Sequence, residues 1–303
     1  MDFLDLNWLR GRTLSVIGLV KNAGKTTMLN AILDDIYASD TLPFPALTSV
    51  GRDGESTDVV TGTYKPGIQL REGTLVATAS ELLRYGDFTR EILASTGVST
   101  PMGEVFIVRA RSGGAVQLGG PSMTEQLKRL RQDFFDFGAS CVLIDGAAGR
   151  RSLGAASVAD GAVLCSGAGL DRSMEKVVEE TVFVAGLMQL PLYDGDGDDS
   201  DILRLRGAVT ESVLTELIGQ GRELAGKTLV TDDPSKLLFS SASYRKLLRL
   251  GARMCLLERP KLLAVGTNPV AVRGWRFDAA RFRGAVQERL PDIPVVDVKE
   301  AKA

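Results

Sequence analysis

Short apolar runs alternate along the chain with stretches in which apolar residues recur every three or four positions. The runs are TLSVIGLV, FPALTSVG, TLVATA, VFIVRA, CVLIDGA and AVLCSGA, and amphipathic stretches such as TTMLNAILDDIYA and SMTEQLKRLRQDFFDFG lie between several of them. CVLID lacks the period-two alternation of a half-exposed strand, as expected of a strand buried on both faces. The pattern predicts an α/β fold, with a mostly parallel sheet flanked by helices.

The alternation is interrupted once, by the acidic segment YDGDGDDSD, and then resumes. We therefore predict a first domain over residues 1–192, an acidic linker over 193–202, and a smaller C-terminal α/β unit over 203–303. The sequence leaves open whether this last stretch is a separate domain or adds strands to the first sheet.

A calcium loop is the alternative interpretation of the acidic segment, because Asp194, Asp196 and Asp198 occupy alternate positions. The sixth position of such a loop is normally glycine and the twelfth glutamate. Here these positions are Asp199 and Leu205, so a solvated linker is favoured.

Composition limits the chemistry that the chain can use. Its 303 residues carry a net charge of -2 and contain no histidine, which excludes imidazole-dependent triads and His-ligated zinc. The three cysteines, Cys141, Cys165 and Cys255, lie in separate apolar runs and indicate buried thiols. The near-neutral charge gives no reason to expect nucleic acid, and no apolar run is long enough for a membrane span. We expect a cytoplasmic protein.

The segment KNAGKTT follows an apolar run and precedes an amphipathic one, as a phosphate-binding loop does. In such a loop the backbone N–H groups surround the phosphates, the lysine reaches the β and γ oxygens, and the next hydroxyl binds Mg²⁺. The usual spacing places a glycine at position 19, whereas this chain has Gly18 and Leu19. The predicted nucleotide-binding residues are Lys21, Asn22, Ala23, Gly24, Lys25, Thr26 and Thr27.

Two carboxylates are candidates for the magnesium site that such a loop requires. Asp145 follows the apolar run CVLI directly, where it can hold a metal-bound water. Asp53, in the polar stretch TSVGRDGESTDVVTGT, can orient the attacking water or bind Mg²⁺, and Arg52 beside it can meet phosphate charge. We predict Lys25, Asp53 and Asp145 as catalytic residues, and Thr26, Asp53 and Asp145 as metal ligands.

Three further positions have candidate roles beside an unremarkable alternative. Asn268 ends a late apolar run and can read a purine edge, although Asn-Pro is also a common turn. Lys21 can reach the nucleotide of a partner subunit in a homodimer, or simply face solvent. The loop that contains Asp171 can sense the γ-phosphate or contact a partner. The sequence does not decide between ATP and GTP.

KNAGKTT together with LIDGA resembles the branch of P-loop NTPases that includes molybdopterin-guanine dinucleotide biosynthesis adaptors and dethiobiotin synthetase. That resemblance covers roughly the first 190 residues. More specifically, GLVKNAGKTTMLN, TSVGRDGE, DVVTGTYKP, GPSMTEQL and the late DIPVVDV are similar to the small nucleotide-binding subunit of the lysine 5,6-aminomutase reactivase. This second resemblance extends over most of the chain.

The resemblance implies an ATP-driven factor that releases damaged cobalamin from an adenosylcobalamin-dependent aminomutase and acts with a larger ATPase subunit. The residues by themselves indicate only a Mg²⁺-nucleotide site, which suits a hydrolysing switch. Two other functions stay open. One is a small-molecule kinase or ligase, with Arg109 and Arg111 as substrate cations. The other is a nucleotide-binding adaptor for cofactor biosynthesis.

Overall fold

A computed structural model describes residues 4–39, 41–51, 67–148, 158–195, 199–219, 221–272 and 274–299. The helices are α1 (Leu6–Leu9), α2 (Lys25–Ala38), α3 (Ser80–Leu83), α4 (Thr124–Asp136), α5 (Met174–Met188), α6 (Glu211–Gly219), α7 (Ser241–Arg249) and α8 (Ala279–Arg289). The longer strands are β1 (Thr13–Gly18), β2 (Pro45–Ser49), β4 (Leu75–Ala79), β5 (Arg90–Thr100), β6 (Gly103–Ala110), β8 (Cys141–Ala148), β9 (Gly161–Gly167), β12 (Thr228–Thr231), β14 (Arg253–Leu256) and β15 (Lys261–Asn268). The short strands are β3 (Ile68–Leu70), β7 (Gly114–Val116), β10 (Ile202–Arg204), β11 (Val209–Thr210), β13 (Leu237–Leu238) and β16 (Val295–Asp297).

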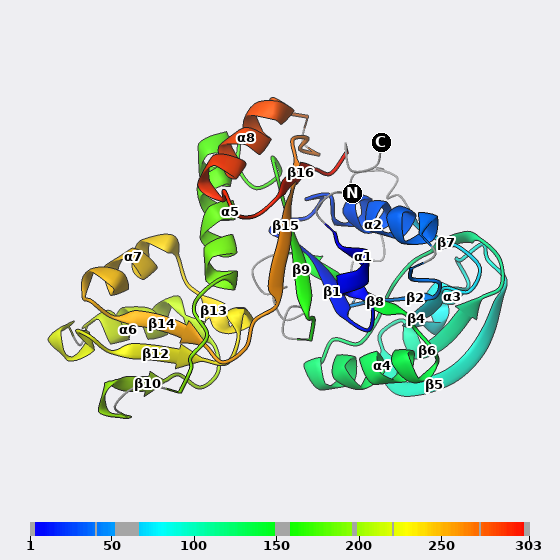
Figure 1. Cartoon of the computed structure of the whole chain (residues 1–303), viewed down its shortest axis with the longest axis horizontal. Helices are drawn as coiled ribbons and strands as arrows, with labels where there is room; N and C mark the ends of the chain where they lie inside the picture. Colours follow the sequence, from blue (N-terminus) through cyan, green and yellow to red (C-terminus); the bar gives the residue numbers. More distant parts are fainter. Residues whose placement is uncertain are drawn as a thin grey trace.

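The main sheet lies at the centre of the molecule, as Figure 1 shows. Among the described residues it has nine strands in the order β16-β15-β9-β1-β8-β2-β4-β6-β5. Neighbouring strands from β16 to β4 are parallel, and only β6 runs against its neighbours. The predicted α/β class with a mostly parallel sheet is therefore confirmed.

Helices cover both faces of this sheet, because each central strand is apolar on both sides. Val163 and Cys165 of β9 belong to the core cluster that includes α2, whereas Ala162 and Leu164 belong to the cluster that includes α5 and α8. Helix α4 packs on the face covered by α5 and α8, farther along the sheet, through Leu127, Leu130 and Phe134. The chain thus leaves β1 and β9 towards opposite faces, the arrangement beside which open α/β sheets commonly bind their ligands.

The edge strand β5 was not predicted from the sequence. Its side chains are exposed or only partly buried along the whole strand, so it lacks the apolar signal of the central strands. Its pairing with β6 shifts register twice, between Ile92 and Ala94 and between Ser95 and Ser99. Such bulges are typical of edge strands, where they discourage pairing with other chains.

The sequence left open whether residues 203–303 form a separate domain or extend the first sheet. In the structure one part of this stretch does each. A separate unit over residues 199–257, called the inserted unit below, contains the parallel sheet β10-β12-β14 with α6 and α7 (Figure 1). Strands β15 and β16 instead return to the main sheet. The core of the inserted unit also includes Leu187 at the end of α5 and Leu190 beyond it, so that helix joins the two parts of the molecule.

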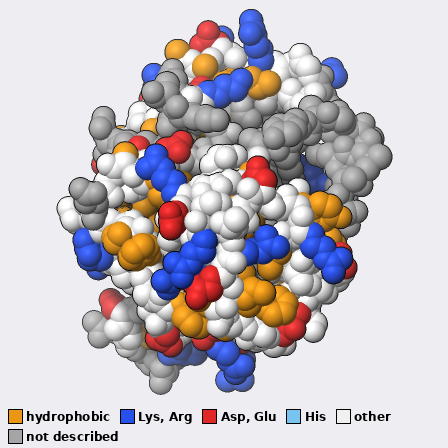
Figure 2. All heavy atoms as spheres, turned by 90° about the vertical axis from the view of Figure 1, so that its right-hand side faces the viewer, with side chains coloured by type: hydrophobic (Ala, Val, Ile, Leu, Met, Phe, Trp, Pro, Cys, Tyr) orange, Lys and Arg blue, Asp and Glu red, His pale blue; other side chains and the backbone are white. Residues whose placement is uncertain are grey.

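Within the described ranges, every helix is too short or too polar to cross a bilayer. Figure 2 shows the face over β5 and α4, where small groups of hydrophobic side chains alternate with charges of both signs. Among the described residues on this face, charges of one sign do not form an extended patch.

Candidate functional site

The turn between β1 and α2 contains the predicted phosphate loop. Gly24 caps α2 with a left-handed backbone (φ 93°), a conformation that glycine adopts without strain. A Cβ at this position would lie 2.7 Å from Cγ2 of Val298, so space as well as conformation requires glycine. The first turn of α2 holds no acidic residue, which leaves the positive end of the helix dipole free of negative side chains.

Neighbouring strand ends fix the shape of this turn. The Leu19 amide donates to the carbonyl of Cys165 on β9 (2.9 Å), and the Ala23 amide donates to that of Val20 (3.3 Å). The side-chain amide of Asn268 at the end of β15 donates to the carbonyl of Asn22 (2.7 Å). The loop is therefore held by β9 and β15 before any ligand arrives.

The position of Lys25 explains why the glycine of this loop stands at residue 18. A Cβ on Gly18 would lie 3.0 Å from Cδ and Cγ of Lys25 and 3.3 Å from its Nζ. The lysine side chain thus folds back across the end of β1, and Gly18 provides the space for it. The turn from Gly18 to Lys25 is thus one residue longer than the usual spacing, with the lysine still lying against this glycine.

Asp145 lies on β8, the strand next to β1, but inside that strand rather than at its predicted end, because β8 continues to Ala148. In β8 it is in register with Val16 of β1 and with Ser49 of β2. The residue is partly buried and its Oδ1 atom is fully buried. Its register partner Val16 lies two residues before the end of β1, so the carboxylate is on the strand beside the one that leads into the phosphate loop.

The thiol of Cys165 lies within electrostatic range of both charged candidates. Burial raises the pKa of Cys165 to about 12, while Lys25 lowers that pKa and Asp145 raises it further. The thiol is therefore protonated at neutral pH. Lys25 and Asp145, although 120 positions apart in sequence, both act electrostatically on this one buried side chain.

Not every predicted residue can be placed. Thr26 and Thr27 lie partly buried in the first turn of α2, and Lys21 is exposed in the loop. Asp53 and Arg52 lie outside the described residues, as do Asp196 and Asp198 of the acidic segment. Among the residues that are described, no group of three His, Cys, Asp or Glu side chains is arranged to hold a metal. The predicted roles of Lys21, Asp53 and the other site residues stay predictions.

The loop after β9 lies beside the phosphate loop and has structural contacts of its own. Asp171 accepts a hydrogen bond from the Ser173 amide (2.7 Å) just before α5. The Arg172 guanidinium stacks 5.2 Å from the ring centroid of Trp275, whose Nε1 donates to the carbonyl of Ala168 (3.0 Å). Trp275 was not predicted at this edge, because no local pattern near it indicates the contact.

Arg109 and Arg111 do not lie at this site. Because β6 is antiparallel to β4, Arg109 is in register with Leu75, the first residue of β4. The phosphate loop instead follows the carboxyl end of β1, so Arg109 lies at the other end of the parallel strands. Arg109 donates to the carbonyl of Phe137 (3.0 Å), and Arg111 pairs with Glu91. Their expected role as substrate cations beside the γ-phosphate is wrong, since the sequence pattern does not report strand direction.

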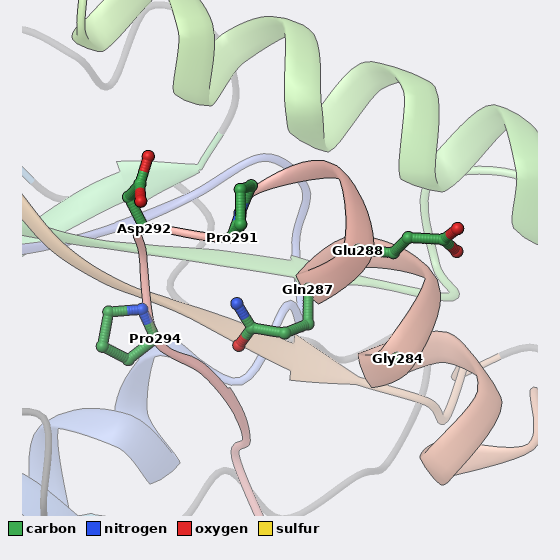
Figure 3. Close-up of a pocket in the computed structure, with 6 residues that line it drawn as sticks. All are labelled: Gly284, Gln287, Glu288, Pro291, Asp292 and Pro294. Carbon is green, nitrogen blue, oxygen red and sulfur yellow. The ribbon is translucent and has the colours of Figure 1, made fainter.

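A shallow surface hollow lies near the end of α8, away from the loop. Figure 3 shows Glu288 and Asp292 pointing in different directions rather than towards a common point. The Gln287 amide donates to the carbonyls of Leu290 and Ile293 and accepts from the Val295 amide, so it closes a turn. The polar groups of this hollow therefore bond to the backbone or point apart, and they do not converge on a common ligand position.

Substituting Gly18 by alanine tests the contact with Lys25. We expect Gly18→Ala to displace the lysine and to weaken Mg-ATP binding about tenfold, the effect of roughly 1.4 kcal/mol of crowding. Titration calorimetry measures this change. Gly284→Ala is the matched control, because a Cβ there meets nothing within 4 Å on α8. Equal affinities in the two variants would contradict the proposed contact.

The chain matches no protein-family model, and none of the curated proteins is significantly similar to it. Its function is therefore argued from the site itself.

Proposed function

We propose that the chain binds a magnesium nucleoside triphosphate and hydrolyses it to remodel a protein partner. One observation carries this proposal: Lys25 at the start of α2 lies over Gly18 at the carboxyl end of β1, and Asp145 lies on the adjacent parallel strand β8, in register with Val16. Lysine, helix N-terminus and carboxylate are the three parts that recognise phosphate and its metal.

The donors of the site fit a bound triphosphate. Backbone amides of the turn and the helix dipole would hold the phosphates, and Lys25 would contact the β and γ oxygens. A Cβ at Gly18 would crowd Lys25 and one at Gly24 would crowd Val298, so glycine at both positions allows the turn its present shape. ATP is the proposed nucleotide, although nothing at the site discriminates against GTP.

The carboxylates and Thr26 suit Mg²⁺, a hard cation with oxygen ligands. The Thr26 hydroxyl would bind the ion, and Asp145 would hold one of its water ligands. Asp53 would complete the shell or orient the attacking water. Bound there, Mg²⁺ supplies neutralisation of the charge that develops on the transferred phosphoryl group.

Helix α5 offers a route from the site to a partner. It begins directly after the Asp171 loop and ends with Leu187 in the core of the inserted unit. A loop that reorders when the γ-phosphate leaves would move the start of this helix, and the inserted unit would move with it. We propose the inserted unit as a part that contacts the partner.

The resemblance of the sequence suggests which partner this is. An adenosylcobalamin-dependent aminomutase, acting with a larger ATPase subunit, would be opened to release damaged cobalamin. The kinase or ligase alternative loses its support, since Arg109 and Arg111 lie at the amino ends of the parallel strands, and the phosphate loop lies at their carboxyl ends.

A phosphate-release assay tests the proposal. We expect the chain alone to hydrolyse ATP slowly, in a Mg²⁺-dependent manner, and to accelerate when the mutase and larger subunit are added. Phosphorylation of a small molecule in proportion to the ATP consumed would instead indicate a kinase. Absence of triphosphate binding in the presence of Mg²⁺ would refute the proposal altogether.

A further inference from the structure

The side chain of Asn268 is oriented by two hydrogen bonds. Its Oδ1 accepts from the Val270 amide (3.2 Å) in the turn that follows β15. Its Nδ2 therefore faces the phosphate loop, where it donates to the carbonyl of Asn22 (2.7 Å), 246 positions earlier in the chain. The strand end thus grips one peptide group of the loop.

The residue that Asn268 holds has an unusual backbone. Asn22 has φ 61°, and it is the only residue other than glycine with a positive φ in the part of the chain that the structure describes. Asparagine tolerates this region better than most residues, but the conformation still needs support from its surroundings. The hydrogen bond from Asn268 fixes the direction of the Asn22 carbonyl.

The surrounding contacts leave Asn268 little freedom to move. Its own carbonyl accepts from the Ala168 amide (2.9 Å). A Cβ on Gly167 would lie 3.0 Å from the Asn268 carbonyl oxygen and 3.5 Å from Cα of Ala23. The phosphate loop therefore packs closely against the ends of β9 and β15. A displacement of one of these three segments would displace the other two.

We propose that Asn268 is a positioning residue for the phosphate loop, rather than a reader of the base. It holds the electronegative Asn22 carbonyl against β15 and so keeps the loop in the shape that receives phosphate. Its donor is directed at the protein backbone, which is why this role differs from purine recognition. The inference rests on the proposed nucleotide site.

Two ligands separate the roles, because tripolyphosphate has the phosphates of ATP but no base. For Asn268→Ala we expect the affinities for Mg-ATP and Mg-tripolyphosphate to fall by the same factor, about fivefold, as for the loss of one hydrogen bond. Titration calorimetry well below the unfolding temperature measures both. A loss confined to ATP would assign Asn268 to the base, and no loss for either ligand would also overturn the inference.

A control distinguishes positioning of the phosphate loop from general damage to the neighbouring loop after β9. Trp275→Phe removes the hydrogen bond to the Ala168 carbonyl but leaves the Asn22 contact in place. We expect it to lower the unfolding temperature and to leave tripolyphosphate affinity unchanged. An equal loss of tripolyphosphate affinity in both variants would mean that Asn268 acts only through fold stability.

A second variant keeps the test sharp if Asn268→Ala does not fold. Asn268→Ser keeps an oxygen that can accept from the Val270 amide but lacks the Nδ2 donor that holds the Asn22 carbonyl. It should lose affinity for both ligands by the same factor, about fivefold. Unchanged affinities for both ligands would overturn the inference. Failure of the parent chain to bind either ligand would instead refute the nucleotide site.

Discussion

A chain that carries Lys25→Ala is expected to lose ATP hydrolysis by at least about a hundredfold and to unfold at the same temperature as the parent. Removal of a cationic donor from a transferring phosphoryl group typically costs about 10²–10³ in rate. The fold should tolerate the change, because Lys25 is the first residue of α2 and alanine is the best helix former. Phosphate release and a thermal melt measure the two properties.

The control for this prediction is Lys128→Ala. Lys128 lies on α4 and is half-exposed beside Glu125. Its substitution therefore removes a lysine that lies outside the phosphate loop. Its hydrolysis rate should equal that of the parent. If Lys25→Ala turned over ATP at the parental rate, the phosphate loop would be wrongly assigned.

The second large effect is expected for Asp145→Asn. An amide cannot replace the carboxylate charge that holds a metal-bound water, so the concentration of Mg²⁺ needed for half-maximal hydrolysis should rise about 10- to 100-fold. The shape of the residue is unchanged, and the unfolding temperature should stay close to that of the parent. A magnesium titration of the hydrolysis rate measures the effect.

Asp34→Asn provides the matched control, since Asp34 is an exposed residue in the middle of α2. It removes the same charge from the chain without changing the sheet edge. An unchanged Mg²⁺ requirement in Asp145→Asn, or an equal shift in both variants, would contradict a role for Asp145 at the metal.

The central part of the fold could be predicted because its signals are local. Strands such as CVLID are apolar on both faces, and the amphipathic helix over 124–136 places Leu127, Leu130 and Phe134 on one side. The edge strand β5 gave no such signal, because neither of its faces is fully buried. Strand direction was also invisible, which is why Arg109 was misplaced.

The site was predictable to the extent that its residues lie beside local patterns. Lys25 and Thr26 open the amphipathic run after KNAG, and Asp145 follows the apolar run CVLI, so their type and position indicated the chemistry. The contacts that shape the loop come from residues far away in sequence. Val298 against Gly24 and Asn268 against Asn22 depend on the return of β15 and β16 to the main sheet, which local pattern cannot report.

A crystal structure of the chain with Mg²⁺ and a non-hydrolysable ATP analogue tests the central claim most directly. We predict that the β and γ phosphates contact the backbone of residues 22–26 and Nζ of Lys25, and that the Thr26 hydroxyl binds the metal with Asp145 one water away. An analogue bound elsewhere, with Lys25 still folded over Gly18 and Asp145 beyond reach of a bridging water, would contradict the account.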